Sequence, residues 1–100
     1  MTQTERIKYY EEVLDKAVSA EAELMPALEK YKKLIPKIRE LEAYYVGDEW
    51  KTDFESDEKG LLPKDLKRGV LSEDAVFDLL ENRREILANM LETVLSAMRG

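Results

Sequence analysis

The sequence has no cysteine and no histidine, and it has only four glycines and three prolines in 100 residues. Without cysteine and histidine, the chain has no disulfides, no thiol nucleophiles, no zinc fingers and no imidazole acid–base chemistry. No apolar run approaches the roughly 20 residues that a membrane-spanning helix needs. The residues that are present are rich in Ala, Glu, Lys, Leu and Arg, a composition typical of long helices and coiled coils.

The formal net charge is −6, from 16 basic and 22 acidic side chains. A net-acidic chain repels phosphate groups, so we expect neither a nucleic acid nor an anionic membrane surface as its partner. Hydrophobic residues make up 44% of the chain, which is too much for a disordered tail and suits one small domain. Met1–Glu5 lacks the basic and apolar regions of a secretory signal, so the expected location is the cytoplasm.

A first long helix is predicted over about residues 3–34. Thr2 and Glu5 have the spacing of a capping box. Apolar residues then follow a heptad series in which most core positions are filled: Ile7, Tyr10, Leu14, Ala17, Leu24, Leu28, Tyr31, Ile35, Ile38 and Tyr45. The series keeps its phase through Pro26, which favours one kinked helix over a break. Pro36 suits the first turn of a separate short helix over about 36–45.

A connector is predicted over about residues 46–71, before a last helix over about 73–98. Its first part, Gly47–Gly60, is interpreted as a loop and carries six acidic residues against two lysines. Ser72 is a favourable N-cap for the last helix, and Glu73 and Asp74 in its first turn complement the helix dipole.

The apolar residues of the last helix cover an arc of about 200° on a helical wheel, which is wider than one partner helix can cover. This helix should therefore contact two others, either the first helix and the short middle helix or the first helix and a second copy of the chain. The predicted fold is all-α, with two long antiparallel amphipathic helices and a short middle helix. They would form a three-helix bundle or a coiled-coil-like hairpin with an irregular connector.

One charged residue interrupts each apolar stripe. Glu21 lies at a core position of the first series, and Arg83 lies near the middle of the last helix's arc. If the two helices are antiparallel with their midpoints level, these side chains face each other, which predicts a partly buried ion pair. The alternative is that Arg83 extends outward to solvent and Glu21 is solvated beside Pro26.

Carboxylates are the only candidate catalytic or metal-binding groups. The acids of Asp53–Asp57 alternate as in a calcium loop, but Glu58 and Lys64 occupy the positions of the required glycine and closing glutamate. We expect no catalytic residue, no metal ligand and no cofactor. The rival interpretation is a protein or enzyme that uses the acidic residues 48–58 to bind a small ligand or a divalent metal.

Five connector residues are the candidate binding residues: Tyr44, Trp50, Asp53, Arg68 and Asp74. The aromatic residues either pin the connector down or form a recognition surface, since Trp and Tyr dominate interface hot spots. Arg68 precedes a helix N-terminus, a place that can bind phosphate. Glu73 and Asp74 already occupy that end, so pairing of Arg68 with nearby acids is favoured over phosphate binding.

The connector resembles a bacterial family of domains of unknown function, number 4298. The resemblance is carried by Leu41, Tyr44 and Tyr45, by Trp50 and Asp53, and by Leu62–Asp74, with Glu5–Ile7 and Leu79–Arg83 in agreement. It implies a small cytoplasmic helical protein and brings no activity, cofactor or assigned site. The wide apolar stripe of the last helix predicts a non-enzymatic interaction or structural module whose partner is a protein or a second copy.

Overall fold

The computed structural model describes residues 1–100 and contains helices and no strands. In chain order these are α1 (Gln3–Tyr45), α2 (Asp48–Glu58), a short 3-10 helix η1 (Gly69–Leu71) and α3 (Ala75–Arg99). The prediction of an all-α fold is therefore confirmed. No helix is both long and apolar enough to cross a membrane.

Helix α1 begins with the capping box expected from the sequence. The Glu5 amide donates to the Thr2 hydroxyl at 3.2 Å, and the Thr2 hydroxyl donates to the Glu5 carboxylate at 2.9 Å. These bonds satisfy groups that the first turn of a helix leaves without partners inside the helix.

The sequence pattern predicts an end near residue 34 and a second helix over 36–45, but α1 is one helix to Tyr45. Pro26 and Pro36 both lie inside it. Neither proline is part of the apolar series, and both side chains are exposed. The carbonyls that lose their helical partners belong to Ala22 and Lys32, which are also exposed, so water can bond to them.

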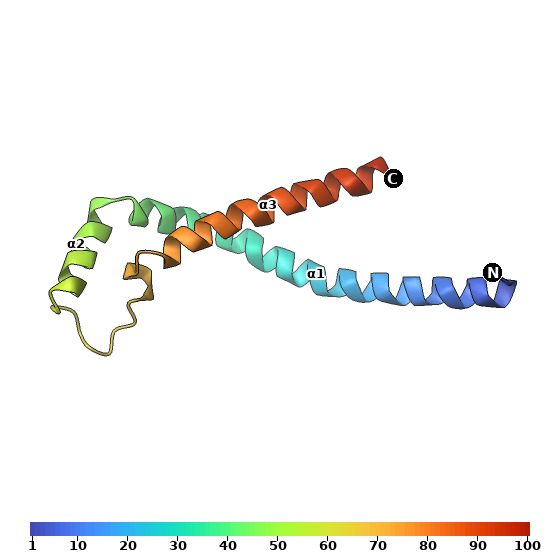
Figure 1. Ribbon diagram of the computed structural model, residues 1–100, viewed down its shortest axis with the longest axis horizontal. Coiled ribbons are helices and arrows are strands. Elements are labelled where there is room, and N and C mark those ends of the chain that lie inside the picture. Colours follow the sequence, from blue (N-terminus) through green and yellow to red (C-terminus); the bar gives the residue numbers. More distant parts are fainter. The chain divides into compact units, whose positions relative to one another are not determined.

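The chain divides into two compact units, residues 1–37 and residues 38–100. The first unit is the long arm of α1, in which every residue before Leu28 is exposed. The second unit holds the last turns of α1 together with α2, η1 and α3. In this unit the chain turns from α1 into α2 and returns through η1 to the start of α3 (Figure 1).

The prediction of a loop over Gly47–Gly60 was wrong, because residues 48–58 form α2. Asp48 and Glu49 lie in its first turn, where negative charge stabilises the helix dipole. Its end has the hydrogen bonds of a Schellman motif, from Gly60 to the Asp57 carbonyl and from Leu61 to the Ser56 carbonyl. This motif requires a left-handed residue, and Gly60 has a φ of 70°.

The core of the second unit is small. It consists of Ile38 from α1, Leu71 from η1 and Val76 from α3, each less than a tenth exposed. The 3-10 helix, which carries Leu71, contacts both α2 and α3. The Ser72 hydroxyl then accepts the Ala75 amide at 3.1 Å and caps α3, as its sequence position indicated.

Candidate functional site

Three aromatic rings gather where α1 meets α2. Trp50 stacks on Phe54 with ring centroids 5.1 Å apart, and it meets Tyr45 edge-on at 5.3 Å. The Trp50 indole donates to the Val70 carbonyl at 3.0 Å, and the Tyr45 hydroxyl donates to the Glu73 carbonyl at 3.3 Å. These bonds join α2 and the end of α1 to the segment that leads into α3.

Tyr44 and Asp53 form the shortest side-chain bond of this region. The Tyr44 hydroxyl donates to Asp53 Oδ2 at 2.6 Å, and both residues are half-buried. The hydrogen bond to Asp53, the burial of the ring and the negative charges of Asp53 and Glu49 together raise the pKa of Tyr44 to about 12. The phenol is therefore held in its neutral, donating form.

Arg68 pairs with an acid of α2. Its Nη1 lies 2.9 Å from Asp57 Oδ1, and both side chains are about one-third exposed. This is the pairing that the sequence analysis favoured over phosphate binding. Asp57 itself was not predicted, because its position one turn after Asp53 is informative only once residues 48–58 are known to be helical.

Asp74 is the one candidate binding residue whose side chain the structure does not join to the rest of the connector. Its side chain is exposed and makes no capping bond to α3, while its backbone carbonyl accepts the Asp78 amide at 2.8 Å. The other four candidates, Tyr44, Trp50, Asp53 and Arg68, each bind another part of the connector or the end of α1. Their geometry is that of an intramolecular clasp, and we use this name below for these four residues with Tyr45, Phe54 and Asp57.

Most of the chain matches the model of one protein family. Domain of unknown function DUF4298 matches residues 7–93, which includes most of α1 and α3 and all of the clasp. The chain belongs to the DUF4298 family. No curated protein and no solved structure matches the chain.

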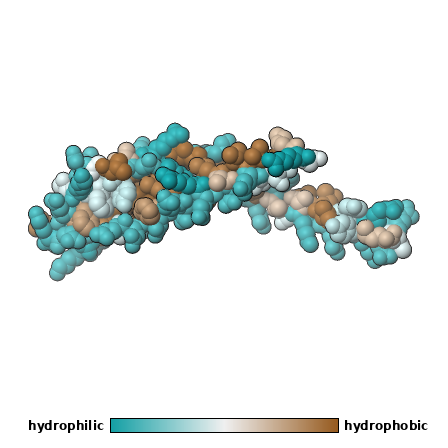
Figure 2. Space-filling view, turned by 45° about the horizontal axis from the view of Figure 1, so that its top comes forward, coloured by the Kyte–Doolittle hydropathy of each residue, from teal (hydrophilic) through white to brown (hydrophobic).

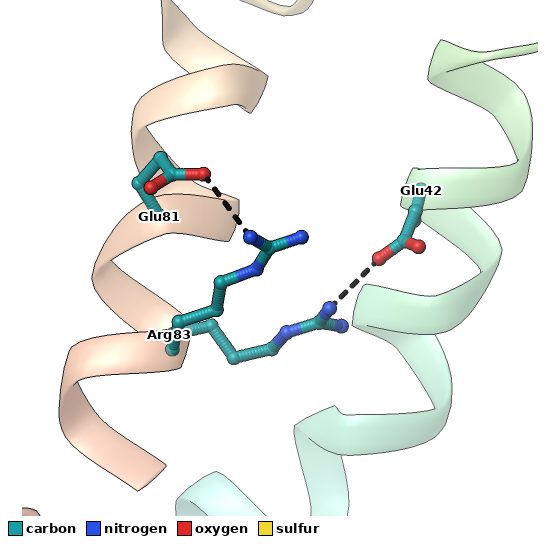
Figure 3. A network of polar contacts seen from close by, with 4 residues as sticks. Glu42, Glu81 and Arg83 are labelled. Carbon is teal, nitrogen blue, oxygen red and sulfur yellow. Dashed lines mark hydrogen bonds and ion pairs between the residues drawn. The ribbon is translucent and has the colours of Figure 1, made fainter. Parts of the chain in front are cut away.

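An ion pair joins the two long helices of this DUF4298 chain, but with a different acid from the one predicted. Arg83 Nη2 lies 2.9 Å from Glu42 Oε2, and α3 and the end of α1 face each other through this contact (Figure 3). Arg84 turns instead to Glu81 of its own helix, at 3.8 Å. Glu21, the predicted partner, makes no ion pair.

The reason for this correction is the length of α1. The prediction assumed that the first helix ends near residue 34 and that the helix midpoints are level. Because α1 continues to Tyr45 and the clasp holds the start of α3 near that end, the acid beside Arg83 is Glu42. Glu21 and Glu42 are three heptads apart and occupy the same core position, so the heptad pattern alone does not distinguish them.

The acidic residues 48–58 of the DUF4298 chain do not form a metal centre in this structure. Nowhere in the chain do three acidic side chains gather in a way that could hold a metal ion. Two of the connector acids are already engaged, Asp53 by Tyr44 and Asp57 by Arg68. A shallow depression lined by Glu92, Thr93, Ser96 and Ala97 lies on α3, outside the clasp.

Proposed function

We propose that this chain is a non-enzymatic helical interaction module of the bacterial cytoplasm that associates with further copies of itself. The observation that carries the proposal is the uncovered apolar face of α3. Five large apolar side chains in its second half are between 44% and 82% exposed: Leu87, Leu91, Val94, Leu95 and Met98. In the first half of the same helix, Val76 is buried and Leu80 is half-buried.

The amount of exposed surface supports a protein partner. The accessible area of the chain is 8769 Å². A compact monomer of 11.6 kDa exposes about 5,800 Å², so this chain exposes about one and a half times as much. Hydrophobic residues are open to solvent on the face seen in Figure 2. Large exposed apolar surfaces on soluble proteins are characteristic of interaction sites.

The clasp has a supporting role in this proposal. It ties α2 and η1 to the ends of the long helices, and its polar side chains bond to one another or to the backbone carbonyls of Val70 and Glu73. Such a connector fixes where α3 begins and so fixes which of its faces stays open. The acidic net charge of the chain favours protein over nucleic acid as the partner.

Analytical ultracentrifugation of the full chain over a range of micromolar concentrations tests the proposal. We expect a concentration-dependent dimer or higher oligomer. Leu91→Asp places a charge on the open face and should weaken the association made through α3 about a hundredfold. Asn89→Asp adds the same charge on the polar face of α3 and should leave association unchanged. A wild-type chain that stays monomeric throughout would contradict the proposal.

A further inference from the structure

The arm of α1 before Pro26 carries an apolar stripe of its own, separate from the face of α3. Its large members are more than half exposed: Ile7, Tyr10, Leu14 and Leu24. A single amphipathic helix in water gains little from intrinsic propensity, and most helical stability in proteins comes from packing of the apolar face. A helical arm in which every residue is exposed therefore calls for a partner.

Helix α3 is too short to be that partner along the whole arm. Arg83 binds Glu42, and α3 ends at Arg99, which is 16 residues later. Whatever its direction, α3 can therefore cover at most about 16 residues of α1 on the N-terminal side of Glu42, and this stretch ends at Pro26. The stripe from Ile7 to Leu24 lies beyond that limit. No other helix of the chain is long enough to cover it.

We infer that residues 3–28 of α1 bind the same segment of a second copy, packed antiparallel about a two-fold axis between Asp15 and Lys16. The inference rests on the proposed self-association and names the surface and the geometry of one contact. The segment is complementary to itself in this arrangement. Ile7 faces the partner's Leu24, and Leu14 faces the partner's Ala17, so that a large side chain meets a small one at the centre.

The polar residue of the stripe also finds a partner in this register. Glu21 faces the partner's Tyr10, a hydroxyl donor for its carboxylate. The same pairing of a tyrosine hydroxyl with a carboxylate occurs within the chain between Tyr44 and Asp53. A two-fold interface of this kind is closed, because each copy offers the same surface and forms every contact twice.

A parallel pairing of the same stripe is less favourable. It would place Glu21 against the partner's Glu21 in one core layer, where two carboxylates repel each other. In return it would gain an ion pair between Arg6 and the partner's Glu11 at exposed flanking positions, and exposed pairs contribute little. The charge pattern therefore selects the antiparallel dimer.

Disulfide trapping tests the geometry, because the natural chain contains no cysteine. Ile7→Cys and Leu24→Cys are made separately in the full chain, one with a short tag, then mixed and oxidised. We expect the mixed disulfide to exceed either homodimeric disulfide about tenfold, since a disulfide needs Cα atoms within about 7 Å. In the antiparallel dimer, Ile7 and the partner's Ile7 are about 25 Å apart along the axis. A dominant disulfide from Ile7→Cys alone would establish the parallel dimer and overturn the inference.

A charge in the stripe tests whether the arm is the interface. Leu14→Asp should raise the dimer dissociation constant about a hundredfold, whereas Ser19→Asp adds the same charge on the outer face and should leave it unchanged. Trp50 is the single tryptophan and lies in the second unit, so its fluorescence reports whether that unit remains folded. A dimer that Leu14→Asp leaves intact and that gives no mixed disulfide refutes this inference but not the proposed function. A monomeric wild-type chain refutes both.

Discussion

Tyr44 donates its hydroxyl to Asp53 across 2.6 Å, and this bond joins the end of α1 to the middle of α2. The two residues are nine positions apart and enclose the turn at Val46 and Gly47. Arg68 and Asp57 make a second bond from α2 to the segment that returns to α3. The direction of the chain after α1 therefore depends on a few side-chain bonds, because the buried core of this unit is only three residues.

Tyr44→Phe removes this hydroxyl and leaves Asp53 without its donor. We expect a loss of about 1–2 kcal/mol in the free energy of unfolding, since a half-buried bond to a charged group is lost. Urea denaturation followed by Trp50 fluorescence measures it. Tyr9→Phe is the matched control, because Tyr9 is exposed and its hydroxyl makes no hydrogen bond. Equal stability of the two variants would show that the Tyr44 bond contributes nothing.

The same bond predicts a pH dependence at the alkaline end. The pKa of Tyr44 is raised from its ordinary value near 10 to about 12 in the folded chain. The folded state thus holds this proton more tightly than the unfolded state, and the resulting stabilisation is fully present below pH 10. It is lost as the pH rises from about 10 to 12. Denaturation midpoints measured across this window should fall more steeply for the wild type than for Tyr44→Phe, and parallel curves would contradict the assignment.

A double-mutant cycle on Arg83 and Glu42 measures the pair that joins the two long helices. Both side chains are partly exposed, so we expect a coupling energy of about 0.5–1 kcal/mol. The Arg84–Glu81 pair is longer and more exposed, and its coupling should be smaller. A cycle on Arg83 and Glu21 should give a coupling near zero. Coupling to Glu21 that exceeds coupling to Glu42 would restore the register predicted from the sequence.

The long helices were predictable because their signals are repeated many times. The heptad series of α1 continues through two prolines, and the capping groups Thr2, Glu5 and Ser72 act on their own nearby backbone. Such local signals do not depend on the rest of the fold. The end of α1 was misplaced only because Pro36 was taken as a helix start rather than as an exposed interior residue.

Helix α2 and the partner of Arg83 were not predictable in the same way. Trp50 and Phe54 are the only large apolar residues of α2, so the segment has too few for a helical period to be recognised. Glu21 and Glu42 share a heptad position, and only the three-dimensional course of α2 and η1 decides which of them Arg83 meets. Four of the clasp residues, Tyr44, Trp50, Asp53 and Arg68, were identified by type, but their pairings depended on a helix that had been interpreted as a loop.

Glu21→Leu should strengthen the inferred antiparallel dimer and weaken its preference for the antiparallel over the parallel orientation. A carboxylate at a core position loses hydration on association, and its bond to the partner's Tyr10 offsets this desolvation cost only in part. A leucine there would continue the stripe, so we expect a dissociation constant about tenfold lower. It would also remove the repulsion that opposes the parallel dimer, because polar core residues fix the orientation of helices in coiled coils. Disulfide formation by Ile7→Cys alone should therefore rise in the Glu21→Leu background.

Glu12→Leu makes the same change on the outer face of α1 and should affect neither the dissociation constant nor the disulfide formed by Ile7→Cys. A Glu21→Leu chain that associates more weakly than the wild type would place Glu21 in a contact other than this one.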